Sequence, residues 1–188
     1  MPDRAAAFLD RDGVINEERN YVHRIEDFEF LPGTLQACRE FVAAGYLLVV
    51  VTNQAGIARG YYNTADFETL TRWMELRFAE AGAPLSGVYY CPHHPEATIA
   101  DLRRACDCRK PAPGLILQAQ RDLGIDLRRS FLVGDKLSDI EAGHAAGMGR
   151  CFLLSDVRDA SATASLRNCV DAVVTSLSDV VAMVSVCV

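Results

Sequence analysis

The chain has 188 residues, half of them hydrophobic and 23% charged, a composition that suits one domain over residues 1–188 with a sizeable core. Its formal net charge of −6 and the lack of a basic run argue against a nucleic-acid partner. No apolar run is long enough for a secretory signal or a membrane span, so we expect a cytoplasmic protein without a membrane partner. Without heptads or a long exposed apolar stretch, we expect a monomer.

The first predicted element is a buried strand, the apolar run of residues 5–9, which stops at Asp10 and Asp12. Gly13 permits a sharp turn after the strand. Two like charges about 4 Å apart repel by roughly 4 kcal/mol at an effective dielectric constant near 20. A divalent cation or a shared proton would offset that repulsion. The alternative is a solvated loop with two surface aspartates, and the hydrophobic strand before the pair argues against it.

Residues 17–29 form a polar stretch that we expect to be a loop or flap over the end of this strand, either a solvated connection or a substrate contact. Beyond it, strands and helices alternate. Apolar spacing and flanking glycines predict helices over residues 34–44, 64–81, 113–123 and 140–146, with Thr64 as an N-cap and a closing helix from about residue 178. Continuous apolar runs predict strands over residues 46–51, 88–90, 130–134, 151–154 and 171–174.

This alternation predicts an α/β fold, a single Rossmann-like parallel sheet with helices on both faces. Ligands bind such sheets beyond the carboxyl ends of the strands. Polar groups follow three of the predicted strands: Asp10 and Asp12, then Thr52 and Asn53, then Asp135. Carboxylates suit Mg²⁺, which commonly binds through one or two of them together with phosphate oxygens. No glycine-rich phosphate loop is present, so the sequence does not support nucleotide binding of that type.

Three of the seven cysteines fall within residues 91–108. Cys91 and His93 form one pair and Cys106 and Cys108 another, twelve residues apart, and these are ligands that Zn²⁺ prefers in closed tetrahedral sites. Without an export signal, metal ligation is favoured over disulfides. The alternative for any one cysteine is a small buried hydrophobic residue. Four protein ligands leave no open position, so we interpret the zinc as structural, with His94 as a bystander.

Four motifs in order resemble those of the haloacid dehalogenase-like (HAD) phosphohydrolases. They are Asp10-x-Asp12-Gly13-Val14, Thr52-Asn53, Lys110 and Gly134-Asp135-x-x-x-Asp139. The resemblance implies a HAD-like fold and a phosphoric monoester hydrolase that depends on Mg²⁺. No insertion after the first or second motif is large enough for a separate cap domain, so the flap and the zinc loop must shape the pocket.

Longer stretches carry a narrower resemblance over about residues 8–154: Asp10–Gly13, Tyr21–His23, Thr52–Gly60, Tyr90–Pro95, Cys106–Pro111 and Gly134–Lys136. They resemble the heptose bisphosphate 7-phosphatases of this superfamily. This resemblance implies a sugar bisphosphate as the small-molecule substrate and a role in making the ADP-heptose precursor of the lipopolysaccharide core. Histidinol-phosphate phosphatases are the alternative, but their gap between zinc-ligand pairs is usually shorter. A zinc-clipped binding module without activity is the remoter alternative, and the presence of both Asp10 and Asp12 speaks against it. The stretch after Leu154 departs from the family's usual loop.

The resemblance also implies residue roles. Asp10 would attack phosphorus and form an aspartyl phosphate, and Asp12 would act as general acid and then base. Mg²⁺ would be held by Asp10, the Asp12 backbone carbonyl and Asp135. Thr52 and Lys110 would stabilise the transferring phosphoryl group, while Asp139 would orient Lys110 or a metal-bound water. The substrate-binding candidates are Asp10, Arg11, Asp12, Glu18, Arg19, Asn20, Tyr21, Thr52, Asn53, Gln54, Ala55, Arg109, Lys110 and Lys136.

Overall fold

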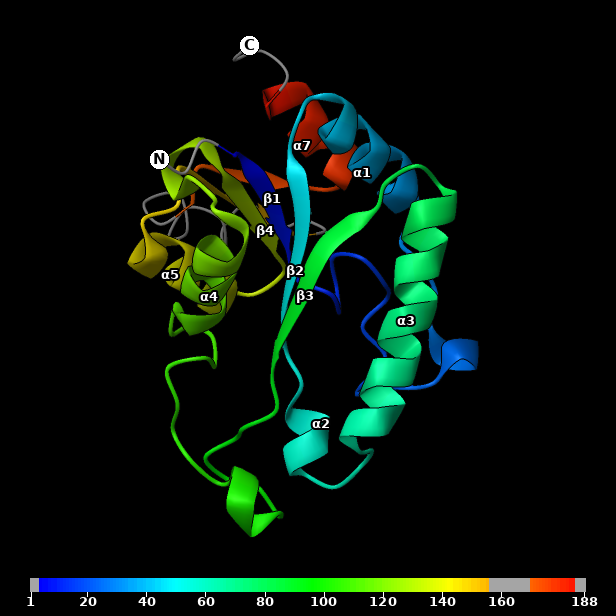
Figure 1. The fold of residues 1–188 in the computed structure, drawn as a ribbon, viewed down its shortest axis with the longest axis vertical. Helices are drawn as coiled ribbons and strands as arrows, with labels where there is room; N and C mark the ends of the chain where they lie inside the picture. Colours follow the sequence, from blue (N-terminus) through cyan, green and yellow to red (C-terminus); the bar gives the residue numbers. More distant parts are fainter. Residues whose placement is uncertain (1–3, 156–169, 185–188) are drawn as a thin grey trace.

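The computed structural model describes residues 4–155 and 170–184, and its centre is one six-stranded sheet in the order β3-β2-β1-β4-β5-β6 (Figure 1). Every neighbouring pair of strands is parallel. The expected α/β class, a single parallel sheet covered by helices, is confirmed. The strands are β1 (Ala6–Leu9), β2 (Leu47–Asn53), β3 (Leu85–Cys91), β4 (Phe131–Gly134), β5 (Arg150–Leu154) and β6 (Ala172–Val174).

Helices cover both faces of the sheet, with α1, α3 and α7 on one side and α4 and α5 on the other (Figure 1). No helix in the described ranges is long and apolar enough to cross a membrane. The segment between β1 and α1 and the zinc loop hold only short turns, so no cap domain is present there, as expected. The helices are α1 (Thr34–Ala43), α2 (Ala55–Ala58), α3 (Thr64–Glu80), α4 (Gly114–Leu123), α5 (Leu137–Ala146) and α7 (Leu177–Val184).

Successive side chains along each strand point to opposite faces of the sheet, so each strand contributes to the two hydrophobic cores, one on either face. Ala7 and Leu9 of β1 face the core under α1, α3 and α7, whereas Ala6 and Phe8 face the core under α4 and α5. All four side chains are fully buried. A strand that buries both faces in this way must be apolar throughout, which is why the runs in the sequence are continuous rather than alternating.

The polar stretch of residues 17–29 is a loop with one short 3₁₀ turn, Ile25–Asp27, as expected. Helix α5 begins three residues before its expected start, and helix α2 was not predicted. The weakly patterned stretch after β5 lies outside the described residues except for Ser155 and Val170.

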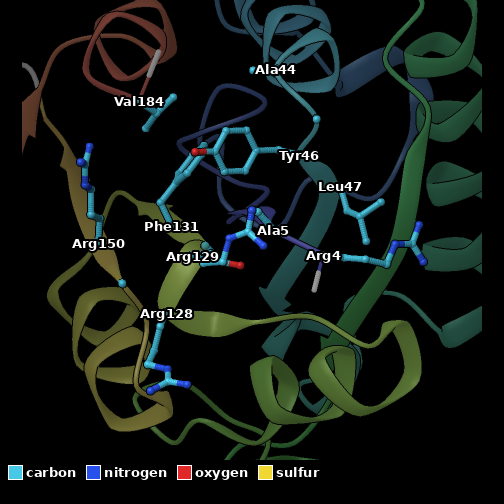
Figure 2. A pocket seen from close by; sticks show the side chains of 13 residues that line it. Arg4, Ala5, Ala44, Tyr46, Leu47, Arg128, Arg129, Phe131, Arg150 and Val184 are labelled. Carbon is cyan, nitrogen blue, oxygen red and sulfur yellow. The ribbon is translucent and has the colours of Figure 1, made fainter. Parts of the chain in front are cut away.

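A pocket of about 710 Å³ opens at the amino ends of the strands, around Tyr46 and Phe131. Figure 2 shows that the arginine side chains around it extend in different directions rather than toward a common point. No carboxylate is among its described lining residues. This pocket therefore lacks the acid pair on which the expected chemistry depends. Its arginines are Arg4, Arg128, Arg129 and Arg150.

The N-cap of α3 is Asn63, so the prediction of Thr64 was wrong by one residue. The Asn63 side chain accepts a hydrogen bond from the Asp66 backbone N–H at 3.0 Å, and the Asp66 carboxylate accepts one from the Asn63 N–H at 2.9 Å. Thr64 already has helical geometry, whereas Asn63 is extended and can turn its side chain back onto the first turn.

We expect Asn63→Ala to lower the free energy of unfolding by about 1 kcal/mol, because an orphan backbone N–H at the start of α3 loses its acceptor. Urea unfolding followed by circular dichroism measures the change. Asn63→Asp is the matched control, since it keeps an acceptor oxygen and should retain nearly all of the stability. Equal losses in the two variants would contradict a capping role.

Candidate active site

Three adjacent strands, β2, β1 and β4, end at the same edge of the sheet and place the predicted catalytic groups together. Leu9 pairs with Val50 on one side and with Val133 on the other. The next residue, Asp10, donates its N–H to the Val133 carbonyl at 3.0 Å, so the sheet pairing continues into the site. In this register, the residues that follow each strand emerge side by side.

Three carboxylates meet at this edge. Asp10, Asp135 and Asp139 each offer one oxygen, and these oxygens all lie within 4.8 Å of one another. Oδ1 of Asp135 is buried and accepts no hydrogen bond. Gly13 approaches closely from the loop after β1, because a Cβ at that position would lie 2.4 Å from Oδ2 of Asp135. A hard divalent cation with oxygen ligands, Mg²⁺ above all, fits this set of donors.

Burial raises the pKa of the Asp10 carboxyl to about 7. The Lys110 ammonium opposes this rise, whereas the neighbouring carboxylates of Asp139 and Asp12 add to it. Burial also raises the pKa of Asp135, and Asp139 adds to that rise while Lys136 opposes it. Like charges gathered out of water therefore favour protonation unless a cation is present.

The Lys110 ammonium is the cation that the chain itself supplies. Its Nζ lies 2.9 Å from Oδ1 of Asp10 and 2.7 Å from Oδ1 of Asp139, and it donates to the Val51 carbonyl at 2.8 Å. Burial lowers the pKa of this ammonium, but the charges of Asp10 and Asp139 outweigh burial and raise it. Lys110 is therefore a charged, fully partnered group in the interior.

Asn53 holds the backbone of Lys110 from both sides. Its Nδ2 donates to the Lys110 carbonyl and its Oδ1 accepts from the Lys110 N–H, both at 3.1 Å. Asp139 acts on the same residue through its side chain, and its second oxygen accepts from the Lys136 N–H at 3.0 Å at the start of α5. Of the two roles considered for Asp139, this geometry favours orientation of Lys110.

The Asp12 carboxylate lies outside the three-carboxylate cluster and is held by donors. Arg11 contacts both of its oxygens, with Nη2 at 2.8 Å from each, and Asn16 and Gln54 donate to it at 3.1 Å. The Arg11 side chain is 1% exposed, and it also donates to the Val22 carbonyl at 2.7 Å. Any substrate contact by Arg11 would therefore have to use its backbone. That contact stays a prediction, as does the role of the Asp12 carbonyl as a metal ligand.

The flap of residues 17–29 reaches the far side of the cleft. Glu18 pairs with Lys136 at 3.2 Å, which links the flap to the start of α5. Asn20 and Tyr21 both have positive φ angles, 57° and 66°, a conformation that L residues adopt at a cost. Arg19 is exposed and is paired with Glu17 and Glu29 on the flap itself, rather than directed toward the carboxylates.

A cleft of about 680 Å³ opens over Asp12, Lys110 and the flap, whereas the predicted site residues Asp10, Arg11, Arg19, Thr52 and Asp135 are not among its lining residues. The chain's two lysines, Lys110 and Lys136, both line it. Of the predicted site residues, ten line the cleft: Asp12, Glu18, Asn20, Tyr21, Asn53, Gln54, Ala55, Arg109, Lys110 and Lys136. Five further lining residues were not predicted, namely Arg59, Tyr62, His94, Pro111 and Ser138.

The four predicted zinc ligands come together beside this cleft. Their three sulfurs lie 3.2 to 3.5 Å apart, and Nδ1 of His93 is 3.4 Å from Cys108 Sγ and 3.7 Å from Cys91 Sγ. Zn–S bonds of about 2.3 Å in a tetrahedron would place sulfurs about 3.8 Å apart, so slight expansion admits the ion. The cysteines are free thiols. These residues fit a tetrahedral metal site.

Comparison with known proteins agrees with this site. A family model described as HAD-hydrolase-like matches residues 107–180. The D-glycero-beta-D-manno-heptose-1,7-bisphosphate 7-phosphatase of Salmonella typhi is 49% identical over 174 residues, 93% of this chain and 92% of that one. The chain belongs to the haloacid dehalogenase-like phosphatases. This HAD-like phosphatase is therefore a phosphoric monoester hydrolase, as the motifs implied.

Two further relatives of this HAD-like phosphatase are informative. The D-glycero-alpha-D-manno-heptose-1,7-bisphosphate 7-phosphatase of Photorhabdus laumondii is 48% identical over 148 residues, 79% of this chain and 81% of that one. The crystal structure of the D,D-heptose 1,7-bisphosphate phosphatase from B. bronchiseptica, complexed with magnesium and phosphate, superposes with a TM-score of 0.83 at 31% identity, covering 96% of this chain and 98% of that one.

We expect Lys110→Met to lower the free energy of unfolding by about 3 kcal/mol at pH 8, because the Asp10 and Asp139 carboxylates lose their buried cation. The deficit should shrink toward pH 5. The pKa of Asp10 is already raised to about 7, and loss of Lys110 raises it further, so protonation relieves the variant as the pH falls below that value.

Urea unfolding in EDTA, at both pH values, measures this difference. Lys136→Met is the matched control. The Lys136 side chain is 56% exposed, so its ion pairs with Glu18 and Asp135 should contribute less than about 1 kcal/mol to the free energy of unfolding at either pH. A pH-independent deficit in Lys110→Met would count against a buried ion pair.

Proposed function

We propose that this phosphatase removes the 7-phosphate of D-glycero-D-manno-heptose 1,7-bisphosphate. The observation that carries the proposal is a single cleft with two kinds of anion-binding group. Lys110 lies at the sheet edge beside the carboxylate cluster that would hold a cation, and Arg59, Arg109 and Lys136 line the same cavity as Lys110. Lys110 suits the phosphoryl group that reacts. The cations of Arg59, Arg109 and Lys136 suit a second phosphate on a small sugar.

The proposal has support from the relatives, whose names specify this substrate in both anomeric forms. Arg109 and Arg59 lie near His94, whose pKa is lowered by burial and by these two charges. Positive charge on that side of the cleft therefore outweighs the opposing effect of the Glu96 carboxylate on His94, and it would attract a bound phosphate. A cytoplasmic place in the supply of ADP-heptose for the lipopolysaccharide core follows from this proposal.

In the proposed mechanism, Asp10 attacks phosphorus and the bond from phosphorus to the sugar oxygen breaks, which leaves an aspartyl phosphate. Asp12 gives a proton to the departing sugar oxygen, which is a poor leaving group as an alkoxide. Asp12 then takes a proton from the water that hydrolyses the aspartyl phosphate and restores Asp10. Lys110 and the Thr52 hydroxyl hold the charge that develops on the phosphoryl oxygens.

The proposed metal ligands are the carboxylates of Asp10 and Asp135 and the backbone carbonyl of Asp12. A Mg²⁺ ion at this position would supply positive charge to the phosphoryl group and lower the repulsion between Asp10 and the incoming phosphate. The orphan oxygen of Asp135 supports this assignment, and so does the phosphatase from B. bronchiseptica that was solved with magnesium and phosphate.

Phosphate release should occur with heptose 1,7-bisphosphate in the presence of Mg²⁺, and Asp10→Asn should abolish it, because an amide is not a competent nucleophile here. The assay should compare both anomers with histidinol phosphate, at equal protein and Mg²⁺ concentrations. Retained binding of inorganic phosphate by Asp10→Asn would show that the variant keeps its site. A clear preference for histidinol phosphate would overturn the substrate assignment, and turnover by Asp10→Asn would overturn the mechanism.

We further propose that Cys91, His93, Cys106 and Cys108 hold a structural Zn²⁺. Cys108 is two residues from Lys110, so the metal would fix the segment that carries the catalytic ammonium. Between Cys91 and Cys108 the only helical element is the short turn Ala100–Leu102, and a closed metal site would help to order this loop.

Cys106→Ala should reduce zinc content from one ion per chain toward zero, lower the melting temperature and reduce phosphate release together. Elemental analysis, thermal unfolding and the phosphate assay give the three values. Cys38→Ala is the control, because Cys38 is buried in the α1 core, far from the loop in the fold, and its loss should leave zinc content unchanged. A stable, fully active variant without zinc would contradict the structural role.

A further inference from the structure

A chain of hydrogen bonds leads from Tyr62 to two groups of the proposed mechanism. The Tyr62 hydroxyl donates to Oε1 of Gln54 at 2.5 Å. Nε2 of the same amide donates to Oδ2 of Asp12 at 3.1 Å and to Oγ1 of Thr52 at 2.8 Å. Gln54 thus connects one tyrosine to the proposed acid and to the proposed phosphate donor.

The directions of these hydrogen bonds matter as much as their lengths. Nε2 of Gln54 donates to the Thr52 oxygen, so the Thr52 hydroxyl can donate its own proton to another acceptor. In the proposed mechanism that acceptor is a phosphoryl oxygen. A reversed amide would set Oε1 against the Asp12 carboxylate, two acceptors facing each other. The Asp12 carboxylate therefore sets the amide orientation, and in that orientation the amide oxygen faces Tyr62 and accepts its hydroxyl proton.

The Tyr62 ring is held tightly in place, although no pattern in the sequence marks it. It is 6% exposed and stacks on the His23 ring of the flap, with centroids 4.9 Å apart and planes 4° from parallel. On its other side lies Gly56 of α2, where an added Cβ would come within 2.1 Å of the ring. The glycine therefore makes the space that the ring occupies.

The Tyr62 hydroxyl also stays protonated, and therefore a hydrogen-bond donor, near neutral pH. Burial raises the pKa of Tyr62 above its ordinary value, and the nearby carboxylate of Asp12 adds to that rise while Arg11 opposes it. A protonated hydroxyl has one hydrogen to give, and the Gln54 carbonyl receives it.

We infer that Tyr62 is a positioning residue of the phosphatase reaction, which fixes the Gln54 amide so that one side chain holds both Asp12 and Thr52 in their working orientations. This inference rests on the proposed function, because Asp12 and Thr52 take their roles from it. Tyr62 itself does not act on the reacting atoms. It acts through Gln54, and its ring couples the flap and α2 to that amide.

Tyr62→Phe removes only the hydroxyl and keeps the ring in its slot between His23 and Gly56. We expect kcat for heptose 1,7-bisphosphate to fall about 5- to 10-fold, the loss that one neutral hydrogen bond implies, with KM changed less than about twofold. Tyr61→Phe is the matched control. The neighbouring Tyr61 is 56% exposed, and its ring contact with Tyr21 survives the change, so its kcat should equal that of the unaltered protein.

A double variant tests whether Tyr62 acts through Gln54. Gln54→Leu alone should lower kcat at least as much as Tyr62→Phe, and the two changes together should lower it no further than Gln54→Leu does, because the tyrosine has then lost its only route. Thermal unfolding of all four proteins shows whether each variant is folded.

Unchanged kcat in a folded Tyr62→Phe variant would overturn the inference while leaving the proposed function intact. A loss seen only in KM, or two losses that multiply in the double variant, would do the same. Absence of phosphate release by the unaltered protein on both heptose anomers would overturn the proposed function, and the inference would fall with it.

Discussion

The site depends on one buried ammonium. Lys110 places a positive charge between Asp10 and Asp139, where it is fully enclosed and also bonded to the Val51 carbonyl. Two carboxylates so close together could not both remain ionised there without a cation, because burial strongly favours their neutral forms. The lysine therefore allows an ionised carboxylate to exist at the end of a hydrophobic strand.

Several independent parts of the chain converge on that lysine. Its backbone is held by Asn53 at the end of β2, its side chain by Asp139 at the start of α5, and its segment follows directly on the cysteines of the proposed zinc loop. A lysine on a loop would ordinarily lose much rotamer freedom on burial. Here the cost is spread over contacts from three elements. A small domain without a cap can thus build a precise site at an open sheet edge.

Much of this arrangement could be predicted from the sequence. The strands β1, β2, β4 and β5 leave a clear signal because they are continuous apolar runs with buried centres, whereas β3 is half-buried and only its residues 88–90 were predicted. Polar residues at the ends of β1, β2 and β4 mark the edge where ligands bind. The motifs predict that Asp10, Lys110 and Asp135 lie together, and the structure brings their side chains together. The proposed zinc site was equally predictable, since Cys91, His93, Cys106 and Cys108 follow a known metal spacing and the structure brings them together.

The features that were missed arise from tertiary contacts. Arg11 lies between two aspartates and looks exposed in the sequence, yet the Val22 carbonyl and the Phe67 ring enclose its guanidinium. Helix α2 has four residues, too few for a periodic pattern. Tyr62 follows a loop with two glycines, and its partners come from elsewhere in the fold: Gln54 accepts its hydroxyl proton and His23 of the flap stacks on its ring. Such residues leave no local signal, because their partners are distant in the chain or belong to another element.

The way the positive charge is distributed has a practical consequence. The chain has seventeen arginines and two lysines, and both lysines line the cleft. A reagent or cellular modification directed at side-chain amines can therefore modify this protein only in the cleft. Lys136 is exposed and would react first, whereas Lys110 is shielded by its carboxylates. The extent of lysine acylation would therefore measure how accessible the cleft is, because no other side chain of this protein carries an amine.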